Sequence, residues 1–339
     1  MADEWAVRQP HPALRQLITR YIGYRQRDLS LRVHRGLPSR HATLIISLEQ
    51  PVRTAWTSGE SLSGSACHLL SENSGPRSSR QGFDSQQLSG SVARRPAAST
   101  AGLRRPSSTA HDDLESHDSP MACQALVGGM HVAPVLIAQD RSQTGLHLEL
   151  NPFGIRALLG LPAAELSGRV VDLAEFGSRR LVSLPDRLAA TGSWERRFAI
   201  LDDVFLAHLA EVAPAAAPAP EIGEAWRRLI VAGGGIRVGA LAGEVGWSRR
   251  HLADRFGREL GLTPKQVARV LRFERAGALL RQHGPMDLAG VAVACGYYDQ
   301  AHLSNEWQAM AGCSPGTWIA EELPNLQDLA GATEPDSPV

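Results

Sequence analysis

The sequence predicts an α+β fold in which a β-rich N-terminal domain precedes an all-α C-terminal domain. Alternating or β-branched apolar runs lie in the N-terminal half, at 43–48 and 146–150. In the C-terminal half, apolar residues recur at helical spacing, and one short pattern occurs twice, from Gly246 and again from Gly296. A proline- and alanine-rich stretch at 213–220 separates the halves and predicts a semi-rigid linker.

The composition excludes several classes of protein. The 35 basic and 35 acidic residues balance, so any DNA contact must come from local clusters of charge. The four cysteines are scattered without a C-x-x-C pair, which argues against a disulfide framework or a structural zinc site. No apolar run approaches the ~20 residues needed to cross a bilayer, and the N-terminus lacks the order of a signal peptide. We therefore expect a cytoplasmic protein with no membrane partner.

The first 52 residues predict one helix and one strand. Apolar residues after His11-Pro12 recur at helical spacing, which predicts a helix that contains Leu14, Leu17, Ile18, Tyr21 and Ile22. The run at 43–48 is rich in β-branched residues and ends before Pro51, so it predicts a strand.

Two further strands are expected after residue 120. The first covers Val132 to Ile137, and the second contains three leucines that alternate with polar residues at 146–150. Because successive side chains of a strand point to opposite faces, His147 and Glu149 should share the face opposite the leucines.

Helices complete the N-terminal half. A turn at 151–154 precedes a short helix that starts at Ile155, and helical patterns continue through 176–212. We interpret 1–52 plus 121–175 as one β-rich domain.

Residues 53–120 interrupt this domain. They contain sixteen serines, repeated Arg-Arg-Pro and Gly-Ser elements, and few large apolar residues. Such a segment cannot bury enough apolar area to offset its ordering entropy, so we expect disorder. Two explanations stay open: a flexible insertion, or a stretch translated from a shifted reading frame.

The first copy of the repeated pattern predicts a helix-turn-helix within an all-α domain at 221–323, which a tail at 324–339 follows. Gly246 tolerates the positive φ of a tight turn, and Ser248 can cap the next helix. Leu252, Phe256 and Leu260 then face the core at helical spacing. Arg249, Arg250, Ala253 and Asp254 are left pointing outward, where a recognition helix reads a major groove.

The second copy repeats this arrangement with a longer turn. Leu303 and Trp307 form its buried pair, and the outward residues are Gln300, Ala301, Ser304 and Asn305. The two glycines that start the copies are 50 residues apart, but Leu252 and Leu303 are 51 apart. The second turn is therefore one residue longer. The recognition helices should cover about 248–258 and 299–309.

A spacer helix should join the two copies. Thr263 and Gln266 can form a capping box around Pro264, and His283-Gly284-Pro285 ends the helix. The nineteen residues at 264–282 would span about 28 Å, close to the ~34 Å between successive major-groove faces. One rigid helix could thus hold two readers on adjacent turns of a duplex.

The outward residues have the chemistry that base edges require. Arginine can bond guanine bidentately, glutamine or asparagine can bond adenine, and an acid can accept from cytosine. The base-reading candidates are Arg249, Arg250, Asp254, Gln300, Ser304 and Asn305. The candidates for phosphate contacts, which add affinity without sequence information, are Arg255, Arg258 and Arg269.

Residues 226–323 resemble the C-terminal domain of AraC-type (AraC/XylS) transcription regulators. The resemblance runs from LAGEVGWSRRHLADRFGRELGLTPKQ through RVLRFERA to VAVACGYYDQAHLSNEW and GCSPGTW. Asp254 and Asn305 depart from the family, which often has arginine at both positions, and this puts the operator sequence in doubt. GLPSRHATLIISL and NPFGIRALLGLPAAEL resemble, more weakly, the family's cupin-like sensor domain, which binds an effector or dimerises.

The resemblance implies a transcription regulator that is not an enzyme. Double-stranded DNA is the expected partner, with a small-molecule effector, a second copy of the chain and RNA polymerase as open further partners. No cofactor or metal is expected, because His34, His41, His131 and His147 lack a tight ligand pair.

Three alternatives stay open. The first is a cupin-like metal-dependent enzyme that uses His147 and Glu149, which would share a strand face. The second is a regulator whose sensor domain is defective because of 53–120. The third is a plain helical bundle whose arginines are solvated.

Overall fold

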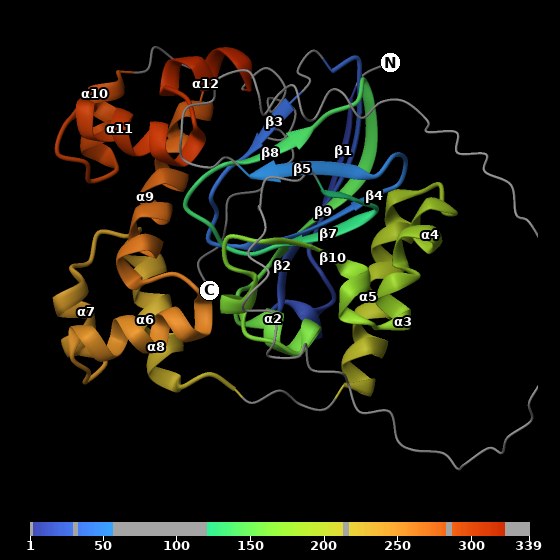
Figure 1. Cartoon of the computed structure of the whole chain (residues 1–339), viewed down its shortest axis with the longest axis horizontal. Helices are drawn as coiled ribbons and strands as arrows, with labels where there is room; N and C mark the ends of the chain where they lie inside the picture. The colour runs from blue at the N-terminus through green and yellow to red at the C-terminus, as the bar shows by residue number, and fades with distance from the viewer. Residues whose placement is uncertain (1–2, 30–32, 57–120, 213–216, 283–286, 323–339) are drawn as a thin grey trace, which may run out of the picture.

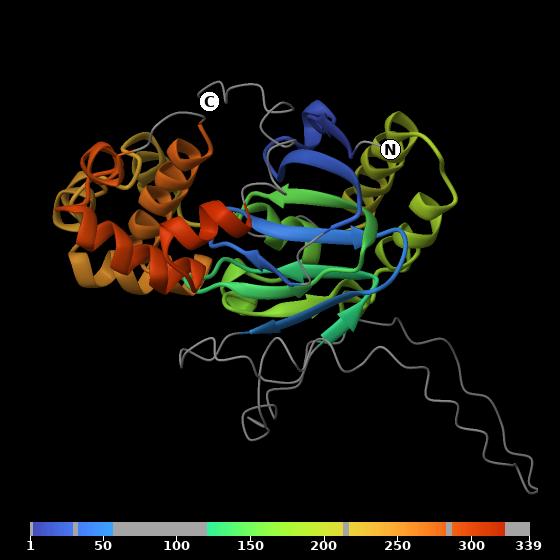
Figure 2. The same cartoon turned by 90° about the horizontal axis from the view of Figure 1, so that it is seen from above.

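The computed structural model describes residues 3–29, 33–56, 121–212, 217–282 and 287–322. The expected tail, and the expected insert from residue 57 to residue 120, lie outside these described residues. The β-strands lie between two groups of helices, one on each side (Figures 1 and 2). This arrangement confirms the α+β class. None of the helices in the described ranges is long and apolar enough to cross a bilayer.

Two antiparallel sheets build the N-terminal domain. The larger sheet contains, in spatial order, β1 (Glu4–Arg8), β2 (Ile18–Arg27), β9 (Ser142–Leu150), β4 (Ala42–Ser47), β7 (Ala125–Gly128) and β10 (Val170–Asp172). The smaller sheet contains β3 (Val33–Gly36), β8 (Val135–Ala138), β5 (Val52–Trp56) and β6 (Met121–Cys123).

The alternation expected at 146–150 is confirmed in β9. Leu146, Leu148 and Leu150 are buried in the main hydrophobic core, whereas His147 and Glu149 line a cavity on the other face of the large sheet. Strand β4 pairs with β9 in matching register, so its alternate residues divide in the same way. The two faces of the large sheet therefore have different roles, one as core and one as cavity wall.

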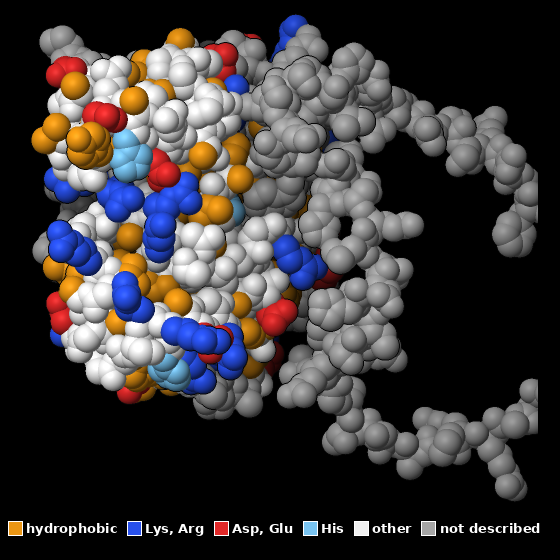
Figure 3. Space-filling view, turned by 60° about the vertical axis from the view of Figure 1, so that its left-hand side comes forward, with side chains coloured by type: hydrophobic (Ala, Val, Ile, Leu, Met, Phe, Trp, Pro, Cys, Tyr) orange, Lys and Arg blue, Asp and Glu red, His pale blue; other side chains and the backbone are white. Residues whose placement is uncertain are grey.

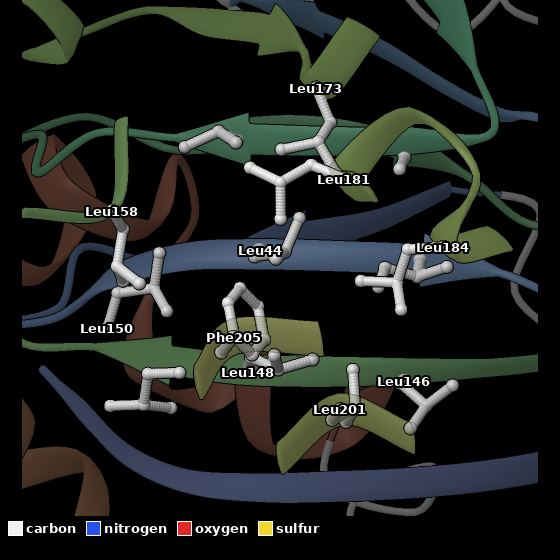
Figure 4. Close-up of a cluster of buried hydrophobic side chains, with 14 of the residues drawn as sticks. Leu44, Leu146, Leu148, Leu150, Leu158, Leu173, Leu181, Leu184, Leu201 and Phe205 are labelled. Atoms are coloured by element: carbon white, nitrogen blue, oxygen red, sulfur yellow. The ribbon is translucent and has the colours of Figure 1, made fainter. Parts of the chain in front are cut away.

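Helices cover the core face of the large sheet. They are α2 (Gly154–Leu159), α3 (Arg179–Val182), α4 (Leu184–Ala189) and α5 (Trp194–Glu211). Leu201 and Phe205 of α5 lie against the leucines of β9, as Figure 4 shows. The buried Asp202 on the same helix accepts hydrogen bonds from the Tyr21 hydroxyl at 3.1 Å and Arg8 Nη2 at 2.7 Å. These bonds tie α5 to the first two strands.

The prediction of a helix from Leu14 to Ile22 is wrong. Only Pro12–Leu14 forms a short 3-10 helix, and the chain then enters β2 at Ile18. Tyr21 faces the core and Ile22 faces the cavity, so both faces of this strand need apolar residues. Apolar residues on both faces remove the two-residue alternation and imitate a helical pattern.

Two expected boundaries also differ in the structure. Residues 53–56 were expected in the insert, but they belong to β5, which pairs with both β6 and β8. The strand expected from Val132 begins only at Val135, directly after Pro134, a residue that lacks a backbone N–H for the ladder.

Seven helices form the described part of the C-terminal domain: α6 (Pro220–Val231), α7 (Val238–Glu244), α8 (Arg249–Leu260), α9 (Pro264–Arg281), α10 (Leu288–Ala294), α11 (Gln300–Ala311) and α12 (Pro315–Glu321). Two separate hydrophobic clusters lie almost entirely within it, and Met130 of the N-terminal domain joins the first. One contains residues of α6, α7 and α8, the other contains residues of α10, α11 and α12, and α9 contributes to both.

Candidate nucleic-acid interface

The first helix-turn-helix consists of α7 and α8. Gly246 takes the positive φ of 74° at the turn, and Ser248 Oγ accepts from the His251 backbone N–H at 3.2 Å. The Trp247 ring meets the imidazole of His251 edge-on, with centroids 4.6 Å apart. Leu252, Phe256 and Leu260 are fully buried, so the opposite side of α8 faces solvent.

The exposed side of α8 is basic. Arg249, Arg250, Arg255 and Arg258 are all exposed, and so is Asp254. Arg250, Asp254 and Arg258 line one shallow hollow together with Ser248 and His251. The structure thus brings three of the expected contact residues of this helix together.

An ion pair links two of these contact residues. Arg258 Nη2 lies 3.1 Å from Asp254 Oδ1, one helical turn away, and both side chains are exposed. Exposed pairs at this spacing contribute about 0.3–0.5 kcal/mol. A nucleic acid that contacts Arg258 or Asp254 could therefore break this ion pair with little loss of free energy.

The second helix-turn-helix consists of α10 and α11. Gly296 has a φ of 75°, and Asp299 Oδ1 caps α11 by accepting from the His302 backbone N–H at 2.7 Å. Leu303 and Trp307 are buried, as their spacing predicts. Gln300 and Asn305 are exposed, whereas Ser304 is half-buried.

The spacer helix α9 begins with the expected capping box. Thr263 Oγ1 accepts from the Gln266 backbone N–H at 3.3 Å, and Gln266 Oε1 accepts from the Thr263 backbone N–H at 2.9 Å. The helix has 18 residues, which corresponds to a length of about 27 Å. Because its residues pack into both hydrophobic clusters, α9 holds the two units at a fixed separation.

Basic side chains gather over one part of this domain. In Figure 3 they lie over the middle and lower part of the face shown, whereas the upper part, where α10 and α11 lie, carries few of them. The two units therefore offer different electrostatic surfaces to a partner.

A comparison of the sequence with known families identifies this part of the chain. Residues 241–321 match the family model for a helix-turn-helix domain. This segment is an AraC-type helix-turn-helix domain. It begins within α7 and ends with α12, so it contains both α8 and α11 and the spacer helix between them.

Solved structures of transcription regulators are similar to the chain. A regulator from Chromobacterium violaceum with an AraC-type DNA-binding domain is 27% identical over 30% of this chain and 90% of its own, with a TM-score of 0.28. ToxT from Vibrio cholerae O395 is 9% identical over 94% of this chain and 97% of its own, with a TM-score of 0.43. ToxT of strain SCE256 with a bound unsaturated fatty acid is 9% identical over 93% of this chain and 97% of its own, with a TM-score of 0.42. No curated protein sequence matches the chain.

Arg269 is placed differently from the other expected contact residues of the AraC-type domain. Its Nε donates to Glu306 Oε2 at 2.7 Å, and both side chains are largely buried, with 27% and 19% exposed. The pair joins α9 to α11. It favours a structural role for Arg269, because a guanidinium held between two helices is not free to follow a phosphate.

We expect Arg269→Gln to lower the free energy of unfolding by about 1–3 kcal/mol, because it leaves Glu306 without its charged partner. The salt dependence of DNA binding should not change. A phosphate contact would instead reduce the slope of log K against log salt by about one. Urea unfolding and salt titrations of the single variants and of Arg269→Gln/Glu306→Gln separate the two roles, since the double variant should recover part of the lost stability.

Between the two sheets of the N-terminal domain lies a cavity of about 900 Å³. Its wall is completed by Ala278 and Arg281 of α9 and by Gln282, the residue that follows this helix, all of which belong to the AraC-type domain. Arg281 is mostly buried there, and this burial lowers the pKa of its guanidinium below the usual value. The spacer helix between the two helix-turn-helix units is thus also part of the cavity wall.

All four histidines considered as metal ligands line this cavity. His131 Nδ1 lies 2.6 Å from the Ala133 carbonyl oxygen, and burial lowers the pKa of its imidazole to about 4. Burial also lowers the pKa of His147, which lies 3.4 Å from the Thr43 hydroxyl. Within the described residues, no three His, Cys, Asp or Glu side chains form a group that could hold a metal ion.

Glu149 is held by an arginine that the sequence analysis did not single out. Arg20 Nε and Nη2 each donate to one oxygen of Glu149 at 2.7 Å, and His41 Nε2 lies 3.9 Å away. Burial opposes ionisation, but the charges of His41 and Arg20 lower the pKa of Glu149 below its usual value. This bidentate pairing weakens the alternative in which Glu149 serves a metal-dependent enzyme, and the helix-turn-helix match also favours a regulator.

A buried carboxylate joins the N-terminal domain to the end of α12. Glu322, at the end of α12, is fully buried and lies 2.6 Å from His34 Nδ1. It also accepts from the Arg35 backbone N–H at 3.1 Å. Burial opposes ionisation, but His34 and Arg35 together lower the pKa of this carboxyl.

Two further glutamates continue this connection along the AraC-type domain. Glu274 of α9 accepts from the Ser39 hydroxyl at 2.8 Å and the Arg40 backbone N–H at 2.9 Å. Glu259 of α8 accepts from Arg156 Nη2 at 2.9 Å. The N-terminal domain therefore bonds to α8 of the first unit, to the spacer helix α9 and to the end of α12. The partners are more than a hundred residues apart, so no local sequence signal could have found them.

Proposed function

We propose that the chain is a sequence-specific DNA-binding transcription regulator whose helices α8 and α11 enter adjacent major grooves of one duplex. The observation that carries this proposal is the pair of capped recognition helices held by α9. Each helix exposes one polar side and buries the other. The length of α9 suits adjacent major-groove faces of B-form DNA.

The exposed residues suggest how the bases are read. Arg249 and Arg250 can donate bidentately to guanine, and Asp254 can accept from the amino group of cytosine. Gln300 and Asn305 can pair with adenine edges. Ser304, which is half-buried, could reach either kind of base.

The phosphate contacts fall to the remaining arginines of α8. Arg255 and Arg258 are exposed and lie on the same helix as the guanine readers. They would add salt-dependent affinity without sequence information.

The cavity of the N-terminal domain is the candidate site for a small-molecule effector. Because Ala278 and Arg281 of α9 line it, an occupant would touch the helix that positions both readers. Contacts with a second copy and with RNA polymerase stay predictions from the family resemblance, as does action in the cytoplasm.

Selection of bound sites from random duplex DNA with the full chain tests the proposal. We expect two specified blocks whose centres are one helical turn, about 10–10.5 base pairs, apart, and an affinity that falls steeply with salt. Weak binding of the same strength to every duplex would contradict it. The alternative enzyme is tested on the same sample by metal analysis, since stoichiometric metal would revive it.

A further inference from the structure

The two recognition helices differ in electrostatic character at equivalent positions. The offset of 51 residues between Leu252 and Leu303 defines the equivalent positions of α8 and α11. Where α8 has an exposed arginine, the equivalent position of α11 has an uncharged or acidic residue. The pairs are Arg249 with Gln300, Arg250 with Ala301, Arg255 with Glu306, and Arg258 with Ala309.

This difference extends over both whole units. Residues 237–261 contain five arginines, whereas 287–312 contain no lysine or arginine. The acids of the second unit include the caps Asp287 and Asp299, at the starts of α10 and α11. Phosphate binding needs local positive charge, so the second unit can add little to the electrostatic part of DNA affinity.

Apolar groups are exposed at the start of α11 instead. Tyr297 is buried as the counterpart of Trp247, so Tyr298 is the residue by which the second turn is longer. Its side chain is 90% exposed, next to the cap of α11. Ala301 is also exposed, in the first turn of the same helix. Because apolar side chains can contact the thymine methyl group in a major groove, a tyrosine exposed beside a recognition helix is a candidate for such a contact.

We propose that the second unit reads a half-site rich in A·T pairs, with Tyr298 and Ala301 against thymine methyl groups. Thymine carries the apolar group of the major groove, and the amides of Gln300 and Asn305 suit adenine beside it. The first unit supplies the phosphate attraction and reads G·C pairs. The proposal rests on the DNA-binding function proposed above and specifies its substrate.

The binding free energy is then divided between the units in an unusual way. The salt slope, about 0.9 per neutralised phosphate, comes from the arginines of α8. Sequence preference at the second half-site comes from uncharged contacts, which salt does not screen. Substitutions in the two units should therefore change different observables.

The test uses the full chain, the site selected from random DNA, and duplexes in which deoxyuridine replaces thymidine. Uracil lacks the methyl group but keeps the hydrogen-bonding edges. We expect each such replacement in the second half-site to weaken binding about fourfold, the effect of one buried methyl group. Replacements in the flanking sequence are the control and should have no effect.

Variants identify the protein partners of these methyl groups. Tyr298→Ala should weaken binding to the thymine duplex about 5- to 20-fold, within the range of such base contacts, and should reduce the effect of uracil. Its salt slope should equal that of the wild type. Arg255→Ala is the matched variant in the first unit, and it should lower the slope by about one without changing the uracil effect.

The possible outcomes distinguish failure of the inference from failure of the proposed function. A selected site whose second block is G·C-rich or unspecified overturns the inference but leaves sequence-specific binding intact. Equal binding to thymine and uracil duplexes also overturns it, as does a footprint confined to the first half-site. The absence of any selected site would overturn the proposed function itself, and the inference with it.

Discussion

Arg250→Ala is expected to weaken binding to the selected duplex by about 5- to 150-fold, the effect of losing one bidentate base contact. Arg250 is exposed near the start of α8 and lines the hollow that Asp254 and Arg258 share. At the position where we expect Arg250 to contact guanine, the variant should also accept other bases. A fluorescence titration with the selected duplex and with duplexes changed at that base measures both effects.

The matched control for this variant is Arg180→Ala. Arg180 is also exposed and also carries one positive charge, but it lies in α3 of the N-terminal domain and pairs with Glu211. Its removal should leave DNA affinity within about twofold of the wild type, because long-range effects of one surface charge are screened by salt. Equal losses in both variants would refute a base-reading role for Arg250.

Trp307→Ala is expected to lower the free energy of unfolding by about 3–5 kcal/mol, the usual cost of removing a buried aromatic ring. The Trp307 ring is fully buried, with centroids 4.6 Å from Phe273 and 5.3 Å from Trp318. It thus holds α11 against both α9 and α12. Urea unfolding measures the loss, and the second half-site should lose its protection in a DNA footprint.

Two companion variants make this result specific. Gln308→Ala changes the exposed neighbour of Trp307 and should alter stability by less than about 0.5 kcal/mol. Trp307→Phe keeps an aromatic ring and removes a buried indole N–H that has no hydrogen-bond partner among the residues that the structure describes. Trp307→Phe should therefore lower the free energy of unfolding by less than Trp307→Ala does. A loss below about 1 kcal/mol in Trp307→Ala would show that this ring does not hold the second unit.

Local patterns predicted much of the C-terminal domain. Both turn glycines, the capping box at Thr263 and the buried faces of α8 and α11 follow from spacings of a few residues. Each of these signals depends on residues only a few positions apart in the chain, so the sequence alone contains all the information needed to recognise it. The roles of the exposed residues in base reading stay predictions.

Strands were predicted less evenly. Strand β9 has one face on the core, and its leucines lie on that face, so the alternation of apolar and polar residues can be recognised in the sequence. Strand β2 places Tyr21 against the core and Ile22 against the cavity, so its pattern lost the alternation and imitated a helix. Which pattern a strand shows depends on what covers each face, and that is decided by tertiary packing.

The sequence alone determined that this chain carries two unequal helix-turn-helix units on one spacer, because turns, caps and helical spacing are encoded locally. Only the tertiary structure decided that Arg269 pairs with Glu306, that Glu322 is buried beside His34, and that the end of α9 closes a cavity. The partners in these contacts lie between 37 and 288 residues apart. No local pattern encodes them, since they form only when whole elements pack together.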